Sequence, residues 1–158
     1  ATNKQICPDG SYTADGKGSC LLCPEGKMSG GNGTCVDISA GYQGVNASND
    51  YVAEGAIQQQ KCPDGKYNET GTGMCIDILG GYEGVDASGE YVIDGAVKSQ
   101  ICPEGTYNTD GHGRCENIPS GYQGEDALGN YTFDGAVNKQ QCPEGWVNID
   151  GKGPCVKL

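Results

Sequence analysis

The sequence predicts a small, disulfide-rich protein of β and irregular structure, arranged as an elongated linear array of modules with almost no helix. Three observations support this fold class: ten cysteines in 158 residues, 28 glycines, and a 40-residue segment that repeats along the chain. Methionine, phenylalanine and tryptophan are scarce, so little apolar volume is left for an ordinary core. We therefore expect covalent cross-links to supply stability that buried aliphatic side chains cannot.

The internal repeat organises most of the chain. Residues 36–75, 76–115 and 116–155 align without a gap, and the last two copies are identical at 22 of 40 positions. This pattern predicts three repeats, each stacked on its neighbours because it is too small to bury a face alone. Residues 1–35 differ, since they hold two short Cys-Pro-x-Gly modules back to back.

The two ends of the sequence lie inside this pattern. Residues 1–7 match residues 136–142, and we interpret residues 156–158 as either a tail or the start of a further repeat. We expect the sequence to be either a window on a longer array or a subunit whose neighbour continues the pattern.

Glycine and Asp-Gly pairs recur every five to ten residues, which leaves no room for a helix of three turns. In the middle repeat we expect short strands near 81–85, 91–93 and 96–101. Turns at 87–89 and 94–95 are expected to separate them.

Local disulfides are predicted from the cysteine spacing. In each module that begins with Cys-Pro-[Asp/Glu]-Gly, 11 or 12 residues separate the first cysteine from the second, whereas the next pair in the repeats lies about 27 residues away. A disulfide that closes a loop of about 14 residues contributes roughly 3 kcal/mol in the chain-entropy model. The Pro and Gly together predict a tight turn after the first cysteine. The expected pairs are Cys7–Cys20, Cys23–Cys35, Cys62–Cys75, Cys102–Cys115 and Cys142–Cys155.

A Cys-x-x-Cys sequence is formed by Cys20 and Cys23, and such sequences occur in redox and zinc sites. Each of these cysteines has a better-spaced partner, however, and the single histidine, His112, is distant in sequence. We interpret the sequence as a junction between two successive disulfides.

The segment from Cys7 to Cys35 begins with the sequence Cys-Pro-Asp-Gly-Ser-Tyr-Thr-Ala-Asp-Gly-Lys-Gly-Ser-Cys, followed by Leu-Leu-Cys-Pro-Glu-Gly. With this sequence it resembles the ephrin-receptor-like cysteine-rich repeat. Such repeats occur in receptor ectodomains and in large surface proteins of protists. The resemblance is clear over residues 1–35 and partial over 36–155, where the extra cysteines of that family are absent. It implies an extracellular, disulfide-bonded, elongated structure without catalytic activity.

An even number of regularly spaced cysteines indicates an oxidising compartment, so we expect a secreted protein of the cell surface or an appendage. Four Asn-x-Ser/Thr sequences predict N-glycans on Asn32, Asn46, Asn68 and Asn130. The net charge of −11 and the single arginine exclude nucleic acid as a natural partner. No apolar run is long enough to cross a bilayer, so we expect no direct membrane insertion by this chain.

Catalytic residues are not apparent, and we expect no enzyme activity. His112 lies where the other modules have Lys17, Thr72 and Lys152, which indicates a solvent-exposed loop tip. With every cysteine assigned to a disulfide, neither a Ser-His-Asp nor a Cys-His arrangement can be built.

Carboxylates recur in each copy, and they leave Ca²⁺ as a possible ligand. They lack the D-x-D-x-D-G spacing of a calcium loop, and Asp before Gly is common in turns, so turn formation is the favoured interpretation and no cofactor or metal site is expected. In the second and third repeats these residues are Asp86, Asp94, Glu104, Asp110, Asp126, Asp134, Glu144 and Asp150.

Two columns of tyrosine recur at the repeat length. Our favoured interpretation is that the rings form the sparse core by packing over the disulfides and the glycine-rich backbone. The alternative is that one column is exposed and stacks on sugars or on a neighbouring subunit. The columns are Tyr42, Tyr82 and Tyr122, and Tyr51, Tyr91 and Tyr131.

Together these features predict a glycosylated subunit of an extracellular filament, appendage or surface coat that associates with itself. An identical repeat favours propagation along an axis. The alternative function is the stalk or ligand-binding ectodomain of a cell-surface receptor or adhesin. A compact secreted inhibitor or toxin is disfavoured, because such proteins gather their disulfides around one centre.

Overall fold

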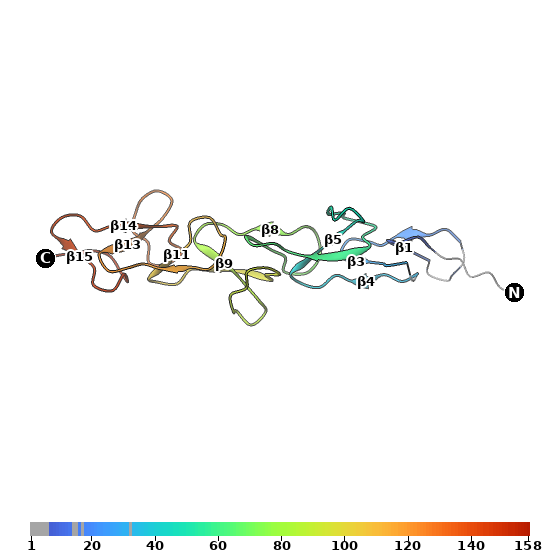
Figure 1. Ribbon diagram of the computed structural model, residues 1–158, viewed down its shortest axis with the longest axis horizontal. Helices are drawn as coiled ribbons and strands as arrows, with labels where there is room; N and C mark the ends of the chain where they lie inside the picture. The colour runs from blue at the N-terminus through green and yellow to red at the C-terminus, as the bar shows by residue number, and fades with distance from the viewer. Residues whose placement is uncertain (1–6, 14–15, 17, 32) are drawn as a thin grey trace. The chain divides into compact units, whose positions relative to one another are not determined.

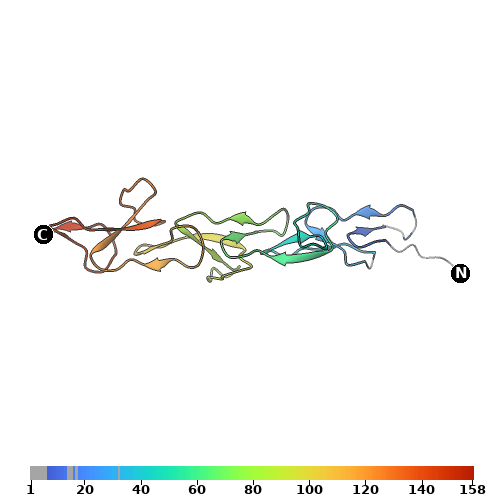
Figure 2. The same ribbon diagram turned by 45° about the horizontal axis from the view of Figure 1, so that its top comes forward.

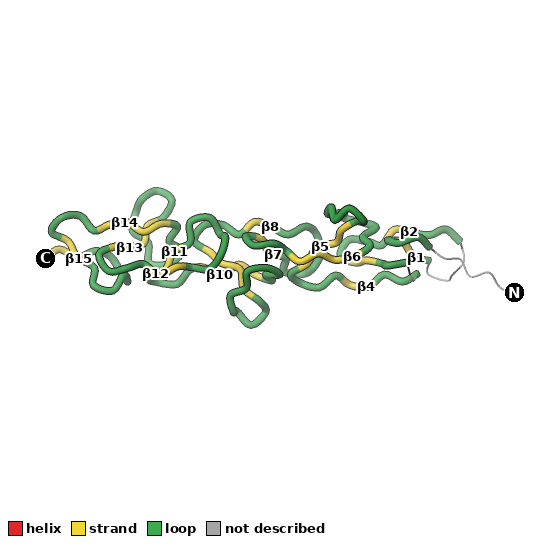
Figure 3. Tube along the Cα trace, viewed as in Figure 1, coloured by secondary structure: helices red, strands yellow, loops and turns green. Residues whose placement is uncertain are grey.

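The computed structural model describes residues 7–13, 16, 18–31 and 33–158. Over these residues the chain forms short β-strands joined by long loops, and it contains no helix (Figures 1 and 3). Figure 2 shows the same strands from a second direction. The described part of the chain therefore has no helix that could cross a membrane. The expectation of a small disulfide-rich all-β fold with repeated modules is confirmed.

Two compact units divide the chain. The first consists of Ala1–Cys62 and Asn68–Ile76, and the second of Pro63–Tyr67 and Asp77–Leu158. Both are built from the same two elements, a long hairpin and a short disulfide-closed hairpin.

The long hairpin begins at the Gly-Tyr sequence of each repeat, and we call it the Gly-Tyr hairpin. Its strands are antiparallel and keep one register, as where Tyr82 lies opposite Ile101. The strands expected near 81–85 and 96–101 are present, whereas 91–93 contributes a single bridge from Tyr91 to Val85. The pairs are β5 (Tyr42–Val45) with β6 (Gln58–Lys61), β9 (Tyr82–Val85) with β10 (Lys98–Ile101), and β13 (Tyr122–Glu125) with β14 (Asn138–Gln141).

The short hairpins lie at the disulfide loops, a term we use for the segment from the first to the second cysteine of a disulfide. The five disulfides are the pairs that the spacing predicts, so Cys20 and Cys23 bond to different partners. The short strands are β1 (Ser11–Tyr12) with β2 (Leu21–Leu22), β3 (Lys27–Met28) with β4 (Val36–Asp37), β7 (Lys66–Tyr67) with β8 (Ile76–Asp77), β11 (Thr106–Tyr107) with β12 (Glu116–Asn117), and β15 (Trp146–Val147) with β16 (Val156–Lys157).

Each disulfide loop opens with the predicted tight turn. The amide of Thr106 donates a hydrogen bond of 3.1 Å to the carbonyl of Pro103, and Gly105 between them has a φ of 83°. A side chain would be strained in this left-handed conformation, which explains why glycine stands there. The other four loops make the same hydrogen bond.

The buried core is thin and is built from Cys, Ile, Val and Ala. In the middle repeat Ile78, Val85 and Ala96 are 2–4% exposed. Gly84 lies directly over them, because an added Cβ would stand 2.8 Å from the Cβ of Ala96. The interpretation of the tyrosine columns as the core was wrong: all six rings are half-buried, and these smaller side chains fill the space under the hairpin.

The first disulfide loop takes the structural place of a Gly-Tyr hairpin. The amide of Gly10 donates to the carbonyl of Ser29 at 2.7 Å, and the carbonyl of Gly10 accepts from the amide of Cys23 at 2.8 Å. The glycine of each Gly-Tyr sequence makes the same two hydrogen bonds to the corresponding residues of its own repeat. The two modules at the start of the chain therefore have different structural roles.

Candidate functional site: repeat contacts and glycosylation acceptors

Within each unit, a disulfide loop meets the Gly-Ala sequence of the next Gly-Tyr hairpin through its backbone. In the second unit the amide of Gly135 donates to the carbonyl of Cys102 at 2.8 Å, and the amide of Asn108 donates to the carbonyl of Ala136 at 3.0 Å. Tyr107 and Ala136 form a parallel bridge. The first unit contains the same contacts, made by Cys23, Met28, Ser29, Gly55 and Ala56.

This contact depends on close approach of two backbones. A Cβ added to Gly81 would lie 2.4 Å from the carbonyl oxygen of Gly135, a separation that real Cβ atoms do not show. Lys139 adds a side-chain contact, since its ammonium lies 5.7 Å from the ring centre of Tyr107 and 5.4 Å from that of Tyr122. Both distances are within the range of cation–π attraction.

A second link ties each hairpin to the disulfide loop of its own repeat. The amide of Cys115 donates to a carboxylate oxygen of Glu83 at 2.7 Å. In the flanking repeats a glutamine amide oxygen accepts the same hydrogen bond, from Cys75 to Gln43 and from Cys155 to Gln123. Gln or Glu follows Gly-Tyr in every copy, and this recurrence was the signal in the sequence for a role that we did not predict.

The predicted glycan acceptor Asn68 is a buried structural residue. Its side chain is 3% exposed, its Nδ2 donates to the carbonyl of Gly73 at 3.0 Å, and its Oδ1 accepts from the amide of Gly71 at 2.9 Å. A glycan needs Nδ2 and open space around it, so the prediction for Asn68 is incompatible with this fold. Asn108 and Asn148 are buried in the same role, and their recurrence at one repeat position was the signal available in the sequence.

The acceptors Asn46 and Asn130 lie at the turn of the Gly-Tyr hairpin loop. Asn130 is exposed, and Asn46 is partly exposed with its Oδ1 accepting from the amides of Ser48 and Asp50. Asp86, the equivalent residue of the middle repeat, makes the same hydrogen bonds through its carboxylate oxygen. Because Asp has no Nδ2 atom, the turn does not need one. The turn therefore leaves Nδ2 of Asn46 available for a sugar.

The fourth predicted acceptor, Asn32, lies outside the described residues. Two of the four acceptors therefore remain compatible with the described structure, and both lie in the connecting loops of the Gly-Tyr hairpins.

Several recurrent carboxylates cap turns. Oδ1 of Asp126 accepts from the amides of Leu128 and Asn130, and Oδ1 of Asp110 accepts from the amide of His112. Asp64 links neighbouring loops, since its Oδ1 accepts from the amide of Gly113 at 2.9 Å. Over the described part of the chain, no three His, Cys, Asp or Glu side chains gather as a metal-binding group.

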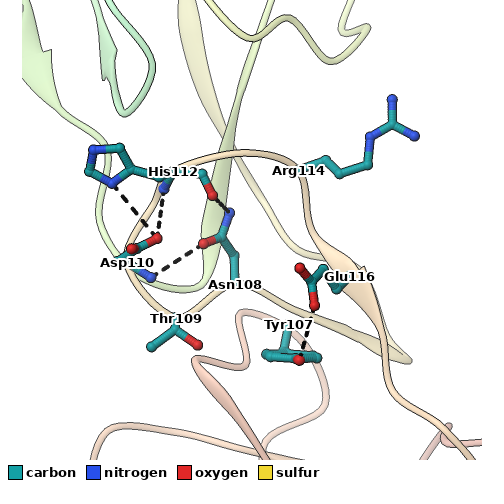
Figure 4. Close-up of a pocket in the computed structure, with 7 residues that line it drawn as sticks. All are labelled: Tyr107, Asn108, Thr109, Asp110, His112, Arg114 and Glu116. Carbon is teal, nitrogen blue, oxygen red and sulfur yellow. Dashed lines mark hydrogen bonds and ion pairs between the residues drawn. The ribbon is translucent and has the colours of Figure 1, made fainter.

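One hollow of the second unit lies on the disulfide loop of the middle repeat (Figure 4). Its volume is about 190 Å³. Across it the hydroxyl of Tyr107 donates to Glu116 at 3.1 Å, while His112 stands 3.7 Å from Asp110 at the exposed loop tip. The guanidinium of Arg114 lies over the ring of Tyr91, 4.8 Å from its centre, and makes a cation–π contact with it.

The column of Tyr51, Tyr91 and Tyr131 is partly withdrawn from water. Burial raises the pKa of all three hydroxyls, and a nearby carboxylate, Asp64 in the case of Tyr91, raises it further. Arg114 opposes this effect at Tyr91. The three phenols therefore stay protonated at neutral pH.

Neither a protein-family model nor a curated protein matches this chain. Its own structure defines it as a disulfide-rich all-β protein of repeated modules. Five disulfides indicate an oxidising, extracellular or secreted environment.

Proposed function

We propose that this chain is a glycosylated structural subunit of an extracellular filament, appendage or surface coat, without catalytic activity or a required metal. The observation that carries the proposal is the contact between a disulfide loop and the next Gly-Ala sequence, which recurs with the same hydrogen bonds in both units. A contact that joins equivalent repeats within a chain can also join chains, and a heterologous contact of this kind produces an open filament.

The glycan positions support this proposal. Asn46 and Asn130 lie at exposed or partly exposed turns of the Gly-Tyr hairpin loops, and neither takes part in the backbone hydrogen bonds between repeats. Sugars on these turns would cover the surface while leaving the repeat contact accessible. The ephrin-receptor-like resemblance of residues 1–35 agrees with an extracellular setting.

Electron microscopy of native, unreduced protein in negative stain tests the proposal. The proposal predicts uniform fibres that are lost in a parallel sample treated with reductant, because the disulfide loops carry the contact groups. Isolated short particles at high protein concentration would contradict it.

The second candidate function is the stalk or ligand-binding ectodomain of a receptor or adhesin. The hollow in Figure 4 favours it, because His112, Arg114 and Glu116 line that hollow in the middle repeat alone; the corresponding residues of the third repeat are Lys152, Pro154 and Val156. A ligand site requires such non-repeating residues. Screening the chain and its Arg114→Ala variant against glycan arrays tests this function, which predicts binding that the variant loses.

A further inference from the structure

A second hollow of the middle repeat lies between the turn of its Gly-Tyr hairpin and its own disulfide loop, and we call it the repeat groove. The turn contributes Glu90 and Tyr91, and the loop contributes Pro103, Thr106 and Arg114. All the lining residues lie between 83 and 115, so a single repeat forms the groove without its neighbours. The volume of about 350 Å³ is within the range of small-molecule pockets.

The backbone that shapes this groove is the same in the third repeat. The hairpin turn is held by a hydrogen bond from the amide of Glu90 or Asn130 to Oδ1 of the aspartate four residues earlier. The loop opens with the same turn, in which the amide of Thr106 or Trp146 donates to the proline carbonyl three residues earlier. The link from hairpin to loop is 2.7 Å long in the middle repeat and 2.8 Å in the third. Asn130 and Trp146 therefore stand at the positions from which Glu90 and Thr106 line the groove.

The side chains of the two grooves differ in their chemistry. Three lining positions change: Glu90, Thr106 and Arg114 in the middle repeat are Asn130, Trp146 and Pro154 in the third. In the middle repeat the Arg114 guanidinium covers the Tyr91 ring, a contact that a proline cannot make because it carries no cation. The third groove is therefore lined by an indole, a phenol and two prolines, and a glycan acceptor stands at its rim.

The acceptor and the indole occur together in one repeat. At the rim position the first two repeats have Asp50 and Glu90, and at the indole position they have Lys66 and Thr106. A sugar ring suits the lining of the third groove, because the C–H groups on one face of a pyranose pack on the electron-rich face of an aromatic ring. Its hydroxyl and N-acetyl groups remain in contact with water.

We propose that the groove of the third repeat holds the first sugar of an N-glycan on Asn130, packed on the indole of Trp146. This inference rests on the glycosylation that forms part of the proposed function, and it states where the sugar lies. Cys115 lines the groove of the middle repeat, so the sugar also covers the equivalent Cys155 and shields the last disulfide from reductants.

Tryptophan fluorescence tests this site, because Trp146 is the single tryptophan of the chain. The chain is secreted from a host that attaches oligomannose N-glycans. One portion is trimmed by an endoglycosidase to a single N-acetylglucosamine at each acceptor, and another is stripped completely by a peptide N-glycosidase. The proposal predicts weak quenching by acrylamide in the intact and trimmed chains, and stronger quenching with emission at longer wavelength in the stripped chain. Equal quenching in all three would overturn it, as would peptide mapping that finds no sugar on Asn130.

Two matched variants assign the effect to one acceptor. Asn46→Asp and Asn130→Glu each introduce the residue that the middle repeat has at the same position, Asp86 and Glu90, so both are compatible with the fold. Asn46→Asp should leave the quenching of Trp146 as in the unmodified chain, whereas Asn130→Glu should raise it as stripping does. A rise in neither variant, or an equal rise in both, would contradict the proposal.

Electron microscopy of the unmodified chain separates this site from the filament proposal. Fibres, together with quenching of Trp146 that does not depend on the Asn130 glycan, would overturn the sugar site and leave the filament proposal standing. Protection of Trp146 by that glycan in a chain that forms only single particles would support the sugar site and contradict the filament.

Discussion

Oδ1 of Asn108 accepts a hydrogen bond of 2.9 Å from the amide of Gly111, and this contact fixes the tip of the disulfide loop. Gly111 has a φ of 82°, and a Cβ there would stand 2.0 Å from the carbonyl oxygen of Ile78. Asn108 thereby holds the loop tip against the segment that enters the Gly-Tyr hairpin. The equivalent Asn68 has the same role in the first repeat.

This role leads to a prediction about N-glycan occupancy. When the chain is secreted from a host that attaches N-glycans, we expect sugars on Asn46 and Asn130 and none on Asn68, because Nδ2 of Asn68 is buried and hydrogen-bonded. Enzymatic deglycosylation in ¹⁸O water followed by peptide mapping identifies each occupied asparagine. Thr132→Ala should remove the Asn130 glycan alone, and a sugar on Asn68 of folded, disulfide-bonded chain would contradict the account.

Glycine substitution tests the close backbone contact between repeats. Gly81 and Gly89 have φ values of 86° and 85°, but only Gly81 faces a backbone oxygen, that of Gly135. Gly89→Ala should lower the free energy of unfolding by about 1–2 kcal/mol through left-handed strain. Gly81→Ala should lower it further, because the facing backbone must also move. Denaturant unfolding with the disulfides intact measures both, and equal losses would argue against the contact.

Removal of one disulfide tests how far the cross-links replace a core. Changing Cys102 and Cys115 together to serine should lower the free energy of unfolding by about 2–5 kcal/mol. Cys102 is fully buried in the thin core, so the cost of burying a hydroxyl group there adds to the loss of the cross-link. Denaturant unfolding gives the magnitude, and disulfide mapping of the variant should show the other four pairs unchanged. An unchanged midpoint would mean that the packing alone holds the loop.

The ion pair of Lys66 and Asp77 gives a prediction for acid. The hydrogen bond from Lys66, and then its charge, lower the pKa of the Asp77 carboxyl below the ordinary value of 3.8. Because the folded pKa is depressed, this stabilisation is present above the ordinary pKa and is lost as pH falls through the lowered one. Both side chains are exposed, so the effect is small and is screened by salt. Asp77→Asn should flatten the pH dependence of unfolding below about pH 4 and leave neutral stability nearly unchanged; a large loss at pH 7 would contradict this explanation.

The disulfide framework could be predicted because the information is local. Cys-Pro-x-Gly fixes a turn, and a second cysteine 12 or 13 positions after the first closes the loop before any other partner is near. The absence of helix over the described residues followed from the glycine spacing in the same way.

The core could not be predicted, because it depends on packing between segments distant in sequence. Ile78 and Ala96 form the core because Gly84, which has no side chain, allows the hairpin backbone to pack closely on them. The larger Tyr82 ring is therefore left half-buried at the edge of the core. An Asn-x-Thr sequence marks Asn68 as a glycan acceptor, but the backbone atoms that bury it belong to the tip of its own loop.

The measurement that tests the central claim most directly is electron microscopy of the native chain beside its reduced form. If the repeat contact joins chains, unreduced protein should form fibres with a regular axial spacing, and reduction should disperse them. Unreduced protein that remains as single particles at every concentration would contradict the claim that this chain is a filament subunit.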